Sequence, residues 1–282
     1  MRRKIDRHLE AVRLYEYHKQ YLVLSHNMKT EWHRHPCIQL SVSYDYSQMK
    51  IDTEQGSQQV YGFIIASNIK HRLHSENKSC FNFLIDPAHP LYHLLLHQIK
   101  NADIIYLKPD SARLIADYFI HCLQSDVPPD ILVLSNCLND IGLNGIGLND
   151  IGLNDIDDCH CSQDTRIIKA TTLITELPVK SISSSKISGH LFLSESRFLH
   201  LFRQEMGTNF RGYLLWKRFH HALEKINSPD SLTLLASHSG FSDSAHFSRT
   251  GVMLYGFSPS ELKNASIAFS DICLRKVSSK KR

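Results

Sequence analysis

Two stretches in the last third of the chain decide the fold. The first is Leu193–Arg203, with the sequence LSESRFLHLFR, and the second is Gly240–Arg249, with the sequence GFSDSAHFSR. In both, serine precedes a run whose apolar residues lie three and four positions apart, which is the pattern of a capped amphipathic helix. A short apolar helix is expected just before each one. Both stretches therefore predict a short helix, a tight turn and a second, partly exposed helix.

Helix start and stop signals extend this pattern through the whole C-terminal region. Ser, Asp or Asn stands at each expected start, and Gly or Pro follows the expected ends. About seven helices are therefore expected from residue 164 onward. Their expected ranges are 166–176, 184–189, 195–206, 210–226, 232–239 and 243–255, with a last helix beginning at Pro259.

The second helix of each pair presents small polar and basic side chains on its outer face. Phe198, Leu201 and Phe202 are expected to face inward from the first, and Phe247 and Leu254 from the second. The outer faces suit the major groove, where arginine reads guanine or phosphate and small side chains approach thymine methyl groups. The candidate DNA-contacting residues are Ser196, Arg197, His200 and Arg203 in the first helix, and Ser244, Ala245, Ser248 and Arg249 in the second.

The net charge of +4 conceals a separation of charge along the chain. Residues 166–282 carry 17 Lys and Arg against 8 Asp and Glu, whereas residues 1–165 carry 15 against 20. A basic region neutralises DNA phosphates and releases counterions, which supplies most of the sequence-independent affinity. The charge therefore favours DNA binding by the C-terminal region, although a solvated basic surface has the same signature.

The composition is that of a globular protein with a substantial core. Hydrophobic residues make up 42% and charged residues 21%, which excludes a wholly disordered or collagen-like chain. The sequence contains no run of 18 apolar residues and no signal-peptide pattern, so we expect a cytoplasmic protein without a membrane partner. The seven cysteines are scattered and predict buried thiols, with Cys159-His160-Cys161 a weak alternative as a soft-metal site.

A tandem repeat separates the acidic and basic halves. Four five-residue copies, each beginning Leu-Asn, run from Leu138 to Asp157. A period of five matches neither a helix nor a strand, and four copies are too few for a stacked solenoid. We therefore predict a flexible linker over residues 126–163, and we expect the domains that it joins to move freely relative to each other.

Short runs of β-branched and aromatic residues mark the first part of the chain. Ile38–Tyr44, Val60–Ile65 and Cys80–Ile85 indicate strands, and apolar spacings of three and four after Pro90 indicate a helical pair. A small β-barrel or sandwich with two helices is therefore predicted for residues 1–125. The whole chain is a multidomain α and β protein, with an all-α domain predicted at residues 164–270 and a basic tail at 271–282.

The C-terminal motifs closely resemble the DNA-binding domain of the AraC/XylS transcription regulators over about residues 164–265. Besides the two opening stretches, the resemblance rests on Gly207, Tyr213-Leu214, Trp216-Lys-Arg218, Ala222 and Tyr255-Gly-Phe-Ser-Pro-Ser260. It implies two helix-turn-helix units joined by one long helix, so that two recognition helices enter successive segments of the major groove. It also implies that the eight candidate residues face DNA, that Gly240 forms the second turn, and that Trp216 and Phe241 are core.

The function implied by this resemblance is transcription regulation, and an activator rather than an enzyme is expected. Double-stranded DNA and RNA polymerase are the expected partners. The second unit departs from the family pattern at Thr250-Gly-Val-Met253, where the family has a Phe and a basic residue. Gly251 is expected to remove a core side chain and to weaken the helix by about 1 kcal/mol relative to Ala. Val252 removes an expected phosphate contact, so a degenerate regulator with impaired DNA binding is one alternative.

The N-terminal region resembles the small cupin barrels that serve as sensory domains in this family. The resemblance rests on His33-Arg-His35, Gln39, Gly62, His71 and His74. It implies a domain that senses a small molecule or pairs two copies of the chain. Because histidines two apart on a strand point to one face, His33, His35 and His71 are weak candidates for a metal site. Gln39 replaces the carboxylate of metal-binding members, so we predict no metal and no cofactor; a metal-dependent cupin enzyme is the second alternative.

Overall fold

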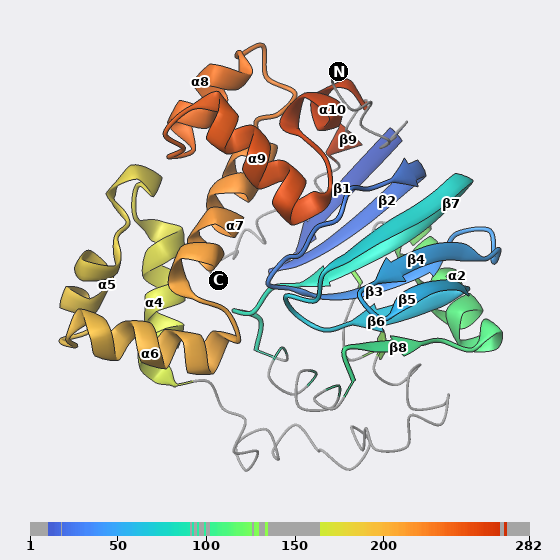
Figure 1. Cartoon of the computed structure of the whole chain (residues 1–282), viewed down its shortest axis with the longest axis horizontal. Helices are drawn as coiled ribbons and strands as arrows, with labels where there is room; N and C mark the ends of the chain where they lie inside the picture. The colour runs from blue at the N-terminus through green and yellow to red at the C-terminus, as the bar shows by residue number, and fades with distance from the viewer. Residues whose placement is uncertain are drawn as a thin grey trace, which may run out of the picture.

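The chain forms an antiparallel sheet followed by a helical region, as the sequence predicts (Figure 1). The computed structural model describes residues 11–17, 19–90, 92, 95, 99, 102–125, 127–129, 133–134, 164–265 and 268–269. The repeats, Cys159-His160-Cys161 and most of the helix predicted after Pro90 lie outside these residues. Within the described part of the chain, no helix is long and apolar enough to span a membrane.

The sheet has nine strands among the described residues. They are β1 (Ala11–Tyr17), β2 (Gln20–Lys29), β3 (Ile38–Ser43), β4 (Met49–Thr53), β5 (Gly56–Val60), β6 (Gly62–Ile65), β7 (His71–Ile85), β8 (Ile104–Tyr106) and β9 (Ala268–Phe269). The order is β8-β6-β3-β7-β2-β1-β9; off this path, β4 pairs with the start of β7, and β5 pairs with β4. Among the described strands, only the β1–β9 pair is parallel.

The described strands form an open sheet rather than the closed barrel that the cupin resemblance implies. Closure requires an edge strand to pair with the opposite edge, and no pairing joins β8 to β1 or β9 within the described residues. Strand β1 is already bonded on both sides, to β2 and to β9. The prediction of a β domain is thus confirmed, whereas barrel closure is not found.

Both faces of the sheet are covered. On one face, Phe81 and Phe83 pack against Phe119 of α2 (Pro109–Ser125), the helix predicted from the apolar spacing around residues 114–119. On the other face, Tyr21 and Leu84 belong to an apolar cluster that continues into the helical region. Residues that alternate along a strand point to opposite faces, so each strand contributes to both cores.

The helical region contains seven α-helices and one 3₁₀ turn in the part of the chain that is described. They are α4 (Thr165–Glu176), the turn η1 (Val179–Ser181), α5 (Ser184–His190), α6 (Glu195–Met206), α7 (Phe210–Leu223), α8 (Leu232–His238), α9 (Ser244–Tyr255) and α10 (Pro259–Asn264). Each α-helix has a Ser, Asp or Asn whose side chain accepts a backbone N–H bond at its start. The boundaries agree with the expected ranges to within one residue, except that α7 ends at Leu223 rather than at residue 226.

The helical region is docked on the sheet, so the expectation of freely moving domains is wrong for the described residues. Asp86, directly after β7, is fully buried and accepts hydrogen bonds from Tyr213 Oη and Trp216 Nε1, each at 3.1 Å. Lys217 Nζ lies 3.8 Å from the same carboxylate and donates to Tyr21 Oη at 3.4 Å. A shared apolar core and a buried carboxylate with partners on α7 hold the two parts together. Separating the two parts would leave the carboxylate and its donors on α7 without hydrogen-bond partners.

Candidate nucleic-acid interface

The first candidate recognition helix is α6. Ser194 Oγ accepts from Arg197 N at 3.3 Å at its start, and Gly207, with φ +62°, ends it in the left-handed conformation. Phe198 and Phe202 are fully buried on its inner side. Ser196, Arg197, His200 and Arg203 are all exposed, as their candidate role requires.

The second candidate recognition helix is α9. Gly240 has φ +78° in the turn that precedes it, as expected, and Asp243 Oδ1 accepts from His246 N at 2.7 Å. Phe247 and Leu254 are buried. Of the four candidate residues, Ser244, Ala245 and Arg249 are exposed and Ser248 is half-buried.

Helix α7 supports both candidate helices. It packs against α6, α8 and α9, which places the two exposed helices on one rigid body. Trp216 is fully buried and stacks on Tyr255 with ring centroids 5.4 Å apart. Phe241 is also buried, so both predicted core aromatics are confirmed.

Gly251 does not leave the void that the family comparison predicts. A Cβ at this position would lie 2.9 Å from the Phe219 ring and 2.8 Å from Phe257 O. Phe219 is fully buried and packs against Phe247 and Tyr255, so its ring occupies the expected space. Helix α9 continues through Gly251 to Tyr255. The packing argument for a degenerate second unit therefore fails.

Two basic residues beside the second turn were not among the sequence candidates. Lys180 from η1 and Arg218 from α7 line a cleft of about 360 Å³ together with Gly240 and His246. Arg218 Nε is buried and has no hydrogen-bond partner among the described residues. Their positive charge is visible in the sequence, but they lie on separate elements, so no local pattern could bring them together with α9.

Arg203 has a second environment at the other end of α6. It lines a cleft of about 510 Å³ with Arg34 of the sheet region and Arg211 of α7. Among the described residues, no carboxylate lines this cleft. Arg203 therefore lies where the helical region meets the sheet, whereas Ser196, Arg197 and His200 lie nearer the start of α6.

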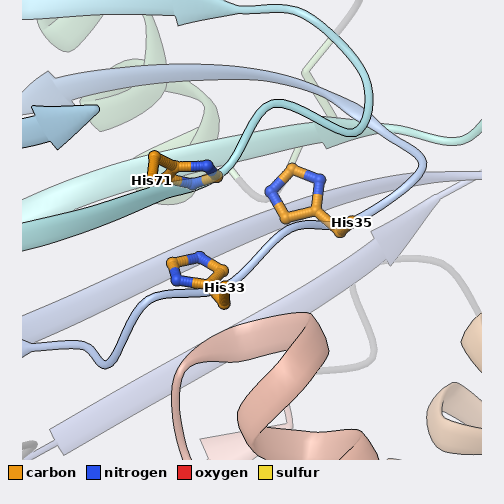
Figure 2. Close-up of side chains that lie close together, drawn as sticks. All are labelled: His33, His35 and His71. Atoms are coloured by element: carbon orange, nitrogen blue, oxygen red, sulfur yellow. The ribbon is translucent and has the colours of Figure 1, made fainter. Parts of the chain in front are cut away.

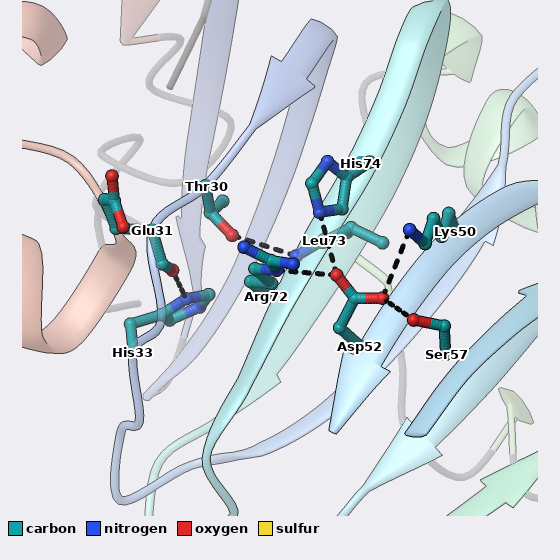
Figure 3. A network of polar contacts seen from close by, with 9 residues as sticks. All are labelled: Thr30, Glu31, His33, Lys50, Asp52, Ser57, Arg72, Leu73 and His74. Atoms are coloured by element: carbon teal, nitrogen blue, oxygen red, sulfur yellow. Dashed lines mark hydrogen bonds and ion pairs between the residues drawn. The ribbon is translucent and has the colours of Figure 1, made fainter. Parts of the chain in front are cut away.

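In the sheet region, the structure brings His33, His35 and His71 together and leaves His74 apart. His74 Nε2 bonds Asp52 Oδ2 at 3.1 Å, and Arg72 Nε donates to the same oxygen at 2.6 Å (Figure 3). Ser57 also donates to Asp52, and Lys50 Nζ lies 3.5 Å from it. This network joins β4 and β5 to the start of β7.

The Asp52 network predicts a loss of stability in acid. Burial raises the pKa of Asp52, but hydrogen bonds from Ser57 and Arg72 and the charges of Arg72 and Lys50 outweigh it and lower the pKa to about 2. Because this lies below the ordinary value of about 3.9, the carboxylate stabilises the fold above about pH 4 and loses that effect as the pH falls toward 2. We expect Asp52→Asn to flatten the free energy of unfolding between about pH 4 and 2, measured by urea denaturation. Glu54→Gln, an exposed control, should leave the acid dependence in place; equal behaviour of the two variants would contradict the assignment.

Comparisons with known proteins match this geometry. A family model described as a helix-turn-helix domain matches residues 187–265, from α5 to the end of α10. A probable transcriptional regulator of Photobacterium leiognathi, LumQ, is 37% identical over 81 residues, which is 28% of this chain and 33% of that protein. The chain thus matches about a third of the length of this curated relative. Residues 187–265 are an AraC-type helix-turn-helix domain.

The arrangement of sheet and AraC-type domain also occurs in solved structures of ToxT from Vibrio cholerae. An apo variant of ToxT aligns with a TM-score of 0.55 at 12% identity, covering 88% of this chain and 98% of that chain. A second ToxT structure, bound to (E)-4-(8-methylnaphthalen-1-yl)but-3-enoic acid, aligns with a TM-score of 0.52 at 14% identity over 90% and 98% of the two chains. At these identities the similarity shows a common fold that includes both the sheet and the AraC-type domain.

Proposed function

We propose that the chain is a transcriptional regulator that binds double-stranded DNA through α6 and α9 and receives its regulatory signal in the sheet region. The observation that carries the proposal is the pair of capped helices in the AraC-type domain, each with an exposed polar and basic face and both packed on α7. Two such helices on one body can enter successive major-groove segments about one helical turn apart. The proposed activity is regulation rather than catalysis.

We assign base contacts and phosphate contacts to different residues. Base reading is assigned to Ser196, Arg197 and His200 of α6, and to Ser244, Ala245, Ser248 and Arg249 of α9. Phosphate contact is assigned to Lys180 and Arg218 beside α9, and to Arg203 near the end of α6, because each borders a basic cleft at or next to a recognition helix. Selection from a random DNA pool with the full chain tests the proposal: an enriched motif with two half-elements about one turn apart supports it, and sequence-blind binding contradicts it.

Arg249→Ala is expected to lower specific affinity about tenfold or more and to change non-specific affinity little. An arginine bonded to a guanine edge contributes about 1–3 kcal/mol of discrimination, and 1.4 kcal/mol is tenfold in affinity. His200→Ala should act in the same direction. Fluorescence anisotropy with the selected site and a scrambled site measures the ratio, and Lys108→Ala removes an exposed charge elsewhere as the control. An equal loss on both sites would make these residues phosphate contacts.

Lys180→Ala is expected to weaken binding to all DNA sequences to a similar extent. A lost phosphate contact should reduce the slope of log affinity against log salt by about 1. The slope is measured from salt titrations with the selected and scrambled sites. A change in sequence preference, or a slope identical to that of Lys108→Ala, would contradict the phosphate assignment.

The effector that we propose is a small, largely apolar molecule. A cavity of about 70 Å³ lies between the sheet and the helices and is lined by Leu14, Met28, Leu73 and Leu84 on one side and Leu223, Tyr255, Phe257 and Leu262 on the other. Among the described residues, its polar lining includes Gln39 and Asn82 and contains no Lys or Arg. The ligand in the ToxT structure is an acid with a large apolar ring system, so a protein of similar fold binds a largely apolar ligand. For this chain the lining favours a ligand with an uncharged hydrogen-bonding end.

The remaining partners follow from this role. We propose contact with RNA polymerase as part of activation, and a second copy of the chain as partner on a two-part site. Residues 1–125, 126–163, 164–270 and 271–282 remain our proposed division into sheet domain, linker, DNA-binding domain and basic tail. Strand β9 lies near the end of the proposed DNA-binding domain but pairs with β1, so this domain contributes a strand to the sheet.

A further inference from the structure

Three buried histidines converge at the seam between the sheet and the AraC-type domain. His33 and His35 come from the segment between β2 and β3, and His71 is the first residue of β7 (Figure 2). One ring nitrogen from each lies within 4.8 Å of the others. The ring centroids of His33 and His71 are 4.2 Å apart. The three rings thus share one small space enclosed by protein.

Each Nδ1 lies within hydrogen-bonding distance of a backbone carbonyl oxygen: His33 of Glu31, His35 of Cys37 and His71 of Ile69, at 2.9, 3.2 and 2.9 Å. A neutral imidazole that donates from Nδ1 has a lone pair on Nε2, which is the form that binds a metal. His35 Nε2 lies 2.7 Å from Gln39 Oε1, so this ring must give up that contact before it can bind a metal. His71 Nε2 is buried and has no hydrogen-bond partner among the described residues. Buried polar atoms without partners are rare, and one that faces two other imidazoles needs an explanation.

Protonation does not explain the cluster. Burial, and the neighbouring His35, lower the pKa of His33 to about 3. Burial also lowers the pKa of His35 and that of His71. All three rings are therefore neutral near pH 7 and available as ligands.

The backbone holds the three residues in register. His33 and His71 exchange backbone N–H···O bonds at 2.9 and 3.0 Å. Next to them, Thr30 N donates to Leu73 O at 3.0 Å, and Leu73 N donates to Thr30 Oγ1 at 2.9 Å. The Asp52 network fixes the other side of β7 (Figure 3). Zinc–nitrogen bonds of about 2.0–2.1 Å require shorter nitrogen separations, which ring rotation and release of the Gln39 contact at His35 Nε2 would supply. His33 and His35 also line the apolar cavity, which leaves room for a fourth ligand.

We propose that His33, His35 and His71 bind one divalent transition metal ion of the zinc type through their Nε2 atoms, and that its binding changes how the end of α9 is held against the sheet region. Two backbone hydrogen bonds on either side of His33 hold it there: Glu31 N donates to Gly256 O at 3.1 Å, and Arg34 N donates to Met253 O at 2.9 Å. Gly256 permits this contact, because a Cβ there would lie 2.5 Å from Thr30 Cβ. Drawing His33 toward His71 moves the segment that holds the end of α9. The effect on DNA rests on the proposed function, but the metal site does not.

The site is tested with the full chain in a Cys159→Ser/Cys161→Ser background, which removes the other sequence candidate for a soft metal. Apo protein is titrated with Co²⁺, followed by visible absorption, and then with Zn²⁺ in competition. We expect one tightly bound ion per chain, with affinity at least about 100-fold lower in His71→Gln, since even outer-shell changes cost about 10–100-fold. His121→Gln, an exposed histidine on α2, is the matched control and should bind as the background does. Absence of binding by the background protein, or unchanged affinity in His71→Gln, overturns the site.

Three further measurements keep the test decisive. Circular dichroism establishes that His71→Gln is folded, and His33→Gln takes its place if it is not. Zn²⁺ should raise the melting temperature of the background protein and not that of the folded variant; an equal rise in both overturns the site. DNA affinity with and without Zn²⁺ tests the coupling: we expect at least about a threefold change that His71→Gln abolishes. Metal binding without a change in DNA affinity overturns the coupling alone, and absence of DNA binding in every state contradicts the proposed function rather than the metal site.

Discussion

Replacing Asp86 by alanine is expected to lower the free energy of unfolding by about 3–5 kcal/mol, because removing one member of a buried charged network leaves the other members without a partner. The carboxylate is fully buried and bonded to Tyr213 Oη, Trp216 Nε1 and Ala88 N. Burial and the charge of Asp86 raise the pKa of Tyr213 well above its usual value, so its hydroxyl remains a donor. Without Asp86, the donors on α7 face an apolar core with no acceptor.

Urea denaturation followed by tryptophan fluorescence measures this effect, since Trp216 is one of two tryptophans in the chain and touches Asp86 directly. Limited proteolysis should cut Asp86→Ala faster at the seam between sheet and helices. Asp86→Asn keeps one acceptor and the side-chain volume, so a smaller loss is expected. Glu54→Ala removes an exposed ion pair, in which Glu54 Oε1 lies 3.9 Å from Lys70 Nζ, and should cost less than about 1 kcal/mol. If Asp86→Ala is no more destabilising than Glu54→Ala, the seam does not depend on this carboxylate.

Gly251→Leu is expected to destabilise the AraC-type domain by about 3 kcal/mol or more. The family comparison treats Gly251 as a lost core residue, which predicts that a larger side chain would improve packing. In the structure, the Phe219 ring and Phe257 O would lie under 3 Å from any Cβ at this position. Overpacking of a filled core typically costs 1–3 kcal/mol, and a leucine adds four carbon atoms where even one does not fit.

Gly189→Leu is the matched control, because nothing lies within 4 Å of a Cβ built at that helical glycine. It should be nearly neutral, since leucine is a better helix former than glycine. Thermal melts of both variants, with DNA affinity at a temperature where both are folded, separate packing from recognition. A Gly251→Leu variant more stable than the parent would restore the interpretation of the second unit as degenerate.

Docking also changes how a signal can pass through the molecule. A long linker predicts free domains, yet the described residues place the sheet in direct contact with α7 and α9. The cavity is lined by residues of both parts, so a ligand in it touches the sheet and the helices at once. A ligand that favours one arrangement of this seam can shift the orientation of α9 without itself contacting the candidate DNA-contacting residues.

The helical part of the fold was predictable because its signals are local. Caps such as Ser194 and Asn209 act on N–H groups three residues away, and apolar spacing of three and four identifies the buried face. The sheet was harder to predict. The sequence analysis did not predict β1, β2, β4 and β8, because a sheet that is covered on both faces lacks a clear alternation of apolar and polar residues. In β5, exposed residues obscure the alternation. The eight candidate DNA-contacting residues remain predictions; seven of them are exposed, which agrees with that role, and Ser248 is half-buried.

The sequence by itself determined the capped helices, the exposed basic faces of α6 and α9, and the β character of the first part, because each depends on residues within about one turn or one strand. The tertiary structure alone decided the features that depend on distant residues. Asp86 and Tyr213 are 127 positions apart, and Phe219 fills the space beside Gly251 from a different helix. Packing complementarity of this kind is a property of the assembled core rather than of any local pattern, which is why the docked seam and the filled space beside Gly251 could be found only in the fold.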